Sequence, residues 1–273
     1  MKKTITDYSL VLLFVGLFFF TFQFINSSIS ALAGSQVTTQ QKISEPTIMV
    51  PGTNGDADRF DELIQKLKET DPDTAVMKVT VKTDGTLAVS GSLNQATKHP
   101  IVVIAFQDAS DGQPAVAKQA KWYQQALTYV HESYAFSNYN VVAHSNGGLV
   151  LTDYLENDRL PEDPQLDHLI TLGTPFNDVG DYNHGNQLKA ISPWLNSYLK
   201  NANKLPTEQL SVLNIAGDQN ATQSDGTVEL ASVKAGAKLY QNSASYTELE
   251  VDASHSDLLT NPVAAQAIET IFH

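Results

Sequence analysis

The chain has 273 residues, of which 42% are hydrophobic and 17% are charged, a balance that fits one α/β domain with a large apolar core. Its formal net charge is −13, and such an acidic surface makes nucleic acid a poor partner and gives no attraction to anionic lipid headgroups. The chain contains no cysteine, which excludes disulfide bonds, a thiol nucleophile and thiolate metal sites.

Residues 1–33 have the layout of a secretory signal. A basic start is followed by an apolar run over residues 8–25 and by the small-residue pattern Ala-Leu-Ala directly before Gly34, which favours cleavage at that point. An uncleaved N-terminal membrane anchor is the alternative, because the apolar run reaches the lower limit of length for spanning a bilayer. In both cases the basic end stays in the cytoplasm, so we expect the rest of the chain to be exported, after a polar tether over residues 34–44.

Residues 45–273 alternate short apolar runs with amphipathic stretches. Buried strands are predicted over residues 47–50, 101–106, 140–143, 169–173 and 211–217. Helices are predicted over residues 58–70, 114–135, 147–155 and 262–272. A hairpin is predicted over residues 75–89, around a turn at 83–86. This alternation predicts an α/β fold with a mostly parallel, doubly wound sheet and helices on both faces. The segment 176–206 is interpreted either as a cap over a site or as a peripheral helix.

The stretch VVAHSNGGLV, residues 141–150, combines a predicted strand, a sharp turn and the start of a helix. This pattern is typical of a nucleophile elbow, with Ser145 as the nucleophile and Ala143 in place of the usual first glycine. The serine of such a turn has a strained backbone and needs small neighbours, which Gly147 and Gly148 provide on the helix side. An ordinary strand-to-helix turn is the alternative interpretation.

Two backbone amides are candidates for binding a developing oxyanion. The amide of Asn146 comes at the N-terminus of the predicted helix, where it can donate to an anion. The second candidate is the amide of Thr53, in the glycine-containing loop 51–55 after the first predicted strand, because glycines let the backbone approach a substrate closely. The alternative is that this loop is only a turn.

A serine hydroxyl needs a general base, and after such an elbow the acid and then the histidine follow along the chain. The histidines after the serine are His168, His184, His255 and His273. We predict His255 as the base because it lies in a polar loop before the last predicted helix. His168 instead precedes a strand, which places it at the wrong end for a catalytic loop.

Two aspartates between the serine and the histidine could orient the imidazole. Asp218 directly follows a predicted strand, and Asp225 lies in the tight turn Ser-Asp-Gly-Thr before an apolar residue. A carboxylate in either place could hold a histidine in the required tautomer. Each could also be a turn-forming aspartate with no other role.

Together these stretches resemble the cell-surface α/β-hydrolases of bacteria, a lipase-like family of largely unassigned activity (domain of unknown function 915). The matching stretches are MVPGTNGDADRFDELI, VTVKTDGTLAVSG leading into PIVVIAF, AHSNGGLV, LITLGTPFND, QSDGTVEL and ASHSDL. The resemblance implies an α/β-hydrolase fold, with Ser145 as nucleophile, Asp225 as acid and His255 as base. It favours Asp225 over Asp218, because relatives place the acid in the Ser-Asp-Gly turn. One departure is Pro51, where relatives usually have histidine before the glycine of the oxyanion loop.

From these residues we expect a serine hydrolase that transfers an acyl group to water and acts on a small-molecule carboxylic ester. Neither a metal nor an organic cofactor is expected, because the histidines lack zinc-ligand spacing and no phosphate-binding glycine motif follows a strand. Contact with a membrane is expected only through an uncleaved N-terminal segment. The alternatives are an amidase or peptidase with the same triad, and a non-catalytic surface binding protein on a hydrolase scaffold.

Overall fold

The computed structural model describes residues 41–270. The predicted leader over residues 1–33, residues 34–40 of the predicted tether and the terminal His273 lie outside the described residues. Within residues 41–270, no helix is long and apolar enough to cross a membrane.

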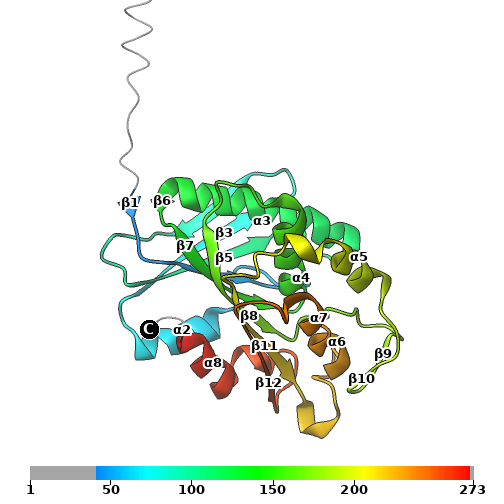
Figure 1. The fold of residues 1–273 in the computed structure, drawn as a ribbon. Helices are drawn as coiled ribbons and strands as arrows, with labels where there is room; N and C mark the ends of the chain where they lie inside the picture. The colour runs from blue at the N-terminus through cyan, green and yellow to red at the C-terminus, as the bar shows by residue number, and fades with distance from the viewer. Residues whose placement is uncertain (1–40, 271–273) are drawn as a thin grey trace, which may run out of the picture. The chain divides into compact units, whose positions relative to one another are not determined.

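An eight-stranded sheet forms the centre of the fold (Figure 1). In spatial order its strands are β12 (Ser245–Val251), β11 (Ser211–Gly217), β8 (Gln165–Leu172), β7 (Asn138–His144), β2 (Thr47–Val50), β5 (His99–Phe106), β3 (Thr74–Val81) and β4 (Leu87–Gly91). Neighbouring strands pair in parallel, except that β3 and β4 form the predicted antiparallel hairpin. The prediction of a mostly parallel, doubly wound sheet is therefore confirmed.

Helices cover both faces of this sheet (Figure 1). On one face are α3 (Gln113–Ser133) and α4 (Asn146–Asp153), and on the other are α2 (Asp61–Thr70) and α8 (Pro262–Glu269). Side chains alternate between the two faces along β2, so that Ile48 and Val50 join the core under α3 and α4, whereas Met49 joins the core under α2 and α8. Burial on both faces explains why the central strands are continuous apolar runs in the sequence.

At β2 the order in which successive strands are added to the sheet changes direction, because earlier strands lie on one side of β2 and later strands on the other. Strand β5 pairs with one side of β2 and β7 with the other, so the loops after β2 and β7 leave the same edge of the sheet side by side. In open α/β sheets this reversal point, at the carboxyl ends of the strands, is where ligands bind. The loop 51–55 and Ser145 both follow directly from it.

Shorter elements join or flank the sheet. They are β1 (Gln41–Lys42), β6 (Tyr134–Ala135), the π-helix η1 (Tyr154–Asp158), β9 (Asn183–His184), β10 (Gln187–Leu188), α5 (Pro193–Asn201), η2 (Ala202–Lys204), η3 (Gln219–Ala221), α6 (Leu230–Lys234), α7 (Ala237–Tyr240) and η4 (Asp257–Leu259). Strand β1 pairs in parallel with β6, and Ile43 next to it is buried in the core. Residues 41–44, expected in the polar tether, are thus part of the folded unit.

The segment 176–206 contains the β9–β10 hairpin and α5 rather than a continuous helix. The buried face of α5 carries Trp194 and Tyr198, and the Trp194 indole N–H donates to the Tyr198 hydroxyl at 3.0 Å. The Tyr198 hydroxyl in turn donates to the carbonyl of Leu149 in α4 at 3.3 Å. Helix α5 is therefore packed against the helix that follows Ser145.

Candidate active site

Ser145 lies at a strained turn between β7 and α4. Its backbone has φ 55° and ψ −132°, a combination that L-residues avoid and that persists only where the surroundings enforce it. Its N–H donates to the carbonyl of Leu172 at the end of β8, at 2.8 Å. A Cβ on Gly147 would lie 2.3 Å from the carbonyl oxygen of Val50, and one on Gly148 would lie 2.2 Å from the hydroxyl oxygen of Thr174. Both glycines are therefore required for the close approach of α4 to the strand ends.

The loop 51–55 lies directly against this turn. A Cβ on Gly52 would lie 2.5 Å from the Ser145 Cβ and 2.9 Å from the backbone nitrogen of Asn146. The glycine therefore brings the backbone of this loop against the serine. The N–H of Asn146 is in the first turn of α4, where backbone donors have no partner within the helix. The adjoining Thr53 is exposed, so its side of the loop is open to a ligand.

The side chain of Asn146 links three segments, which the sequence analysis did not foresee. Its amide nitrogen donates to the Thr53 hydroxyl at 2.7 Å and to a carboxylate oxygen of Asp111 at 2.6 Å. Asn146 itself is only 6% exposed, whereas Thr53 and Asp111 are exposed. They fasten the elbow to the loop 51–55 and to the loop before α3. The sequence carried no signal for this contact, because Asp111 is an ordinary turn residue 35 positions away from Asn146.

Asp225 and His255 form a hydrogen-bonded pair. The His255 Nδ1 and an Asp225 carboxylate oxygen are 2.7 Å apart, and the Asp225 side chain is fully buried. The other carboxylate oxygen accepts the N–H groups of Thr227 and Val228 at 2.9 and 2.7 Å. The backbone N–H of His255 also donates to the Asp225 carbonyl at 2.8 Å. The carboxylate is therefore held in one orientation, with one oxygen directed at the imidazole.

Residues at the end of β8 connect this pair with the elbow. Leu172 accepts the Ser145 N–H, and the next residue, Gly173, lies beneath the pair with φ +59°. A Cβ on Gly173 would lie 2.9 Å from the Asp225 carboxylate and 3.1 Å from the His255 Nδ1. One short stretch of backbone thus contacts the serine and the acid–histidine pair, although within residues 41–270 the Ser145 hydroxyl forms no hydrogen bond with His255.

His144 packs beside the histidine of this pair. Its Nε2–H donates to the carbonyl of His255 at 2.9 Å, and the two rings are 4.7 Å apart. Burial and the neighbouring His255 together lower the pKa of His144 to about 3, so His144 is neutral near pH 7. Its Nε2–H donates to the backbone of the His255 loop and so holds that loop in place.

Within residues 41–270, the other candidate residues form no hydrogen bond with Ser145 or His255. A carboxylate oxygen of Asp218 accepts the N–H of Gln223 at 2.6 Å, which closes a turn. His168 contacts Asn140 at 2.9 Å near the opposite ends of β7 and β8, and His184 is exposed in β9. Among residues 41–270, no three His, Asp or Glu side chains are grouped in a way that could hold a metal ion.

The doubly wound sheet and the elbow between β7 and α4 are features of the α/β hydrolases. The chain belongs to the family described as alpha/beta hydrolase of unknown function (DUF915), which matches residues 35–273. The resemblance predicted from the sequence is thus confirmed, and the family supports a hydrolase.

Two solved structures are similar to most of the chain. The "putative cell surface hydrolase" from Lactobacillus plantarum WCFS1 is 34% identical, with a TM-score of 0.73 over 83% of this chain and 90% of that chain. A gene product of Listeria innocua is 27% identical, with a TM-score of 0.74 over 82% of this chain and 92% of that chain. No curated protein matches the sequence.

Proposed function

We propose that the protein is a serine hydrolase that cleaves carboxylic esters outside the cytoplasm, with Ser145, His255 and Asp225 as its catalytic triad. The observation that carries this proposal is the 2.7 Å contact between His255 and the buried Asp225, joined through Leu172 and Gly173 to a strained serine. Nucleophile, base and orienting acid are the three roles that acyl transfer from a serine requires.

In the proposed mechanism, Ser145 Oγ attacks the ester carbonyl while His255 Nε2 takes the serine proton. The N–H groups of Thr53 and Asn146 bind the negative oxygen of the tetrahedral intermediate. The intermediate expels the alcohol, which leaves with the proton from His255. Water then attacks the acyl-serine and gives a proton to His255. That proton returns to Ser145 Oγ as the carboxylic acid departs.

In this mechanism Asp225 acts on the histidine rather than on the substrate. Its carboxylate accepts the Nδ1–H of His255, which leaves Nε2 free to accept a proton, and it stabilises the imidazolium that then forms. The two backbone donors on its other oxygen keep the carboxylate in place during turnover.

The proposal is tested by labelling the purified protein with a fluorophosphonate probe and by measuring turnover of p-nitrophenyl acetate. We expect the wild type to be labelled and Ser145→Ala to lose both labelling and turnover. Asp225→Asn should lower turnover by about ten-thousand-fold at neutral pH, as it does in comparable triads. Asp218→Asn is the matched control and should stay active. Labelling of Ser145→Ala, or an inactive Asp218→Asn beside an active Asp225→Asn, would contradict the assignment.

We also propose export, on the basis of the leader pattern in residues 1–33 and the name of the Lactobacillus plantarum relative. The expected mature protein begins at Gly34 and is found outside the cytoplasm. Mass spectrometry of the native protein, after separation of culture medium, envelope and cytosol, tests both points. An intact N-terminus in the envelope would identify an anchor, and an intact protein confined to the cytosol would refute export.

A further inference from the structure

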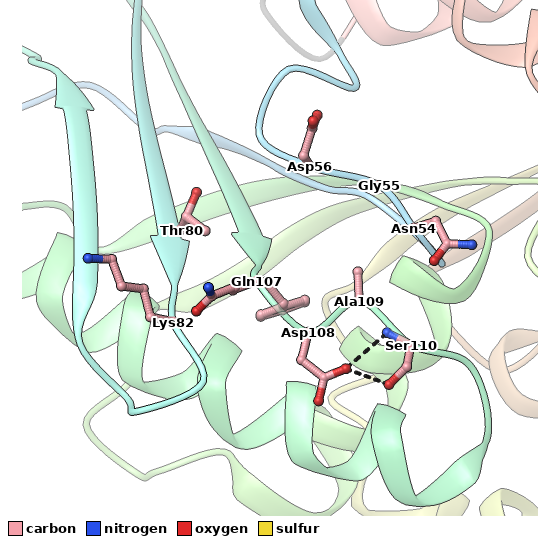
Figure 2. Close-up of a pocket in the computed structure, with 10 residues that line it drawn as sticks. Asn54, Gly55, Asp56, Thr80, Lys82, Gln107, Asp108, Ala109 and Ser110 are labelled. Atoms are coloured by element: carbon pink, nitrogen blue, oxygen red, sulfur yellow. Dashed lines mark hydrogen bonds between the residues drawn. The ribbon is translucent and has the colours of Figure 1, made fainter.

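A second feature at the same edge of the sheet is a cavity of about 550 Å³ formed by the loops after β2, β3 and β5. Figure 2 shows Asn54 and Asp56 on the first of these loops, across from Thr80 and Gln107. The volume is within the range of about 300–1,000 Å³ that is usual for small-molecule sites. Seven of the ten lining residues are polar or charged, and the carbon atoms of the lining add an apolar surface of similar extent.

Some polar groups of this cavity are already bound to the protein. Asp108 accepts the hydroxyl of Ser110 at 2.6 Å and lies 3.4 Å from the Lys118 ammonium. The side-chain oxygen of Gln107 accepts the N–H of Thr83 at 3.0 Å. This bond fixes the amide of Gln107 and leaves its NH₂ group available to a ligand.

Other polar groups of the cavity are uncommitted. Within residues 41–270, the Thr80 hydroxyl and the Asn54 side-chain amide form no hydrogen bond, and the Lys82 ammonium forms no ion pair. After the hydrogen bonds from Thr86, Lys82 contributes to the lowered pKa of Asp84. With the NH₂ group of Gln107, these uncommitted groups supply several donors and two acceptors along the cavity, with Lys82 at one end and Asn54 at the other (Figure 2). The ring of Phe106, stacked on Trp122 at 6.2 Å between centroids, forms the apolar part of the lining.

These groups select against most kinds of ligand. An alkyl chain would remove them from water without replacing their hydrogen bonds, which is costly. A phosphate-like dianion would face Asp56 and Asp108 on a chain of net charge −13, and a cation would face Lys82. A neutral group with several hydroxyls matches the cavity, because each hydroxyl both donates and accepts.

The cavity and the serine share one loop. Gly52 is in contact with Ser145, and Asn54, two residues further, lines the cavity. Consecutive Cα atoms are about 3.8 Å apart, so these two residues are separated by at most about 8 Å. The N–H of Asn54 donates to the carbonyl of Ala109 at 2.8 Å, which joins the loop to the opposite wall. The cavity thus begins within two residues of the loop position that contacts Ser145.

We infer that this cavity binds the hydroxylated part of the substrate, so that the enzyme removes short acyl groups from a sugar-like or polyol compound. The inference rests on the proposed function, since it specifies the substrate of the same serine. It makes Thr80 and Lys82 specificity-determining residues that contact the alcohol portion and take no part in the acyl-transfer steps.

The first experiment compares a hydroxylated acetate with a purely aliphatic acetate as kinetic substrates of the full chain. These are 6-O-acetyl-glucose and cyclohexylmethyl acetate, which share the ester and a six-membered ring. We expect kcat/KM to be at least tenfold higher for the sugar ester. An equal or higher value for the cyclohexyl ester would overturn the inference.

The second experiment uses the near-isosteric variants Thr80→Val and Lys82→Met, with Lys98→Met as the control. Lys98 is exposed and paired with Asp73 at 2.7 Å near the start of β5, at the other end of the sheet. Each cavity variant should lower kcat/KM for the sugar ester about tenfold, mainly through KM, while turnover of p-nitrophenyl acetate stays within twofold. Equal losses on both esters, or no loss, would contradict the assignment.

A direct binding measurement separates this inference from the proposed function. Saturation-transfer NMR with methyl glucoside should detect binding to the wild type, and weaker binding to Thr80→Val and Lys82→Met. Binding without turnover of any ester would refute the hydrolase proposal and leave the cavity assignment standing. Turnover of p-nitrophenyl acetate without glucoside binding would refute the cavity assignment alone.

Discussion

Replacement of Gly52 by alanine should separate catalysis from folding, because this glycine has the closest contact with the proposed nucleophile. The added Cβ would lie 2.5 Å from the Ser145 Cβ and 2.9 Å from both the Asn146 nitrogen and the His144 carbonyl oxygen. Ordinary contacts of a Cβ begin near 3.4 Å, so the loop and the elbow must separate by about 1 Å. All three contacted residues belong to the elbow, so the movement cannot be absorbed by a flexible side chain.

The expected cost follows from that displacement. A shift of about 1 Å in a catalytic arrangement costs roughly a hundredfold in rate, and the loss of one oxyanion donor costs about a hundred- to a thousandfold. We therefore expect Gly52→Ala to lower kcat for p-nitrophenyl acetate by about two to three orders of magnitude, with little change in KM. Overpacking of this kind destabilises a protein by about 1–3 kcal/mol, which leaves it folded.

The assay is steady-state turnover, with circular dichroism melts on the same samples. Gly180→Ala is the control, because its Cβ would meet only the Tyr182 ring at 3.6 Å, an ordinary contact, and it should retain full activity. A Gly52→Ala protein that melts normally and keeps its kcat within threefold would show that the loop 51–55 does not border the reacting ester.

Three further predictions concern single side chains. Ser145→Ala should melt at the same temperature as the wild type or higher, because the strained serine contributes to function rather than to stability; a melting temperature several degrees lower would contradict this. Asn146→Ala should lower kcat about tenfold, because the bonds to Thr53 and Asp111 that hold the loop 51–55 against the elbow are lost. Unchanged kcat would mean that this loop holds its shape without them. Burial, together with the nearby Asp153, raises the pKa of Glu156 in η1 to about 8. The folded protein therefore holds a proton that the unfolded chain releases near pH 4.5, and the stability of the wild type relative to Glu156→Gln should fall as the pH rises from 5 to 9. A constant difference in melting temperature between the two proteins from pH 5 to pH 9 would refute this explanation.

The parts of the fold that the sequence predicted depend on local patterns. Strands β2, β5 and β7 are continuous apolar runs, and the elbow needs only a strand, small residues and a helix in succession. Strand β12 lacks such a signal, because it is at the sheet edge and its sequence SYTELEV is mostly exposed. It was not predicted, although it is the strand that leads to His255.

The parts of the site that depend on distant contacts could not be predicted from local patterns. Asp218 and Asp225 are both turn aspartates after β11, and the pairing of β11 with β12 decides which of them meets the loop of His255. Sequence reasoning left the two open until the family resemblance favoured Asp225, the one that contacts the imidazole. The bonds of the Asn146 side chain join residues from three loops, and no periodicity or spacing reports such a contact.

The pairing of β1 with β6 has a mechanical consequence. Gln41 and Lys42 are fastened beside Tyr134 and Ala135, just before β7 begins, whereas Ser145 follows the other end of that strand. The seven residues of β7 separate these points by about 23 Å at 3.3 Å per residue. A force applied at Gln41 would act first on the parallel β1–β6 pair and on the buried Ile43. The loops that form the cavity and the elbow lie at the opposite edge of the sheet, so this point of attachment is separated from the proposed active site by the length of β7.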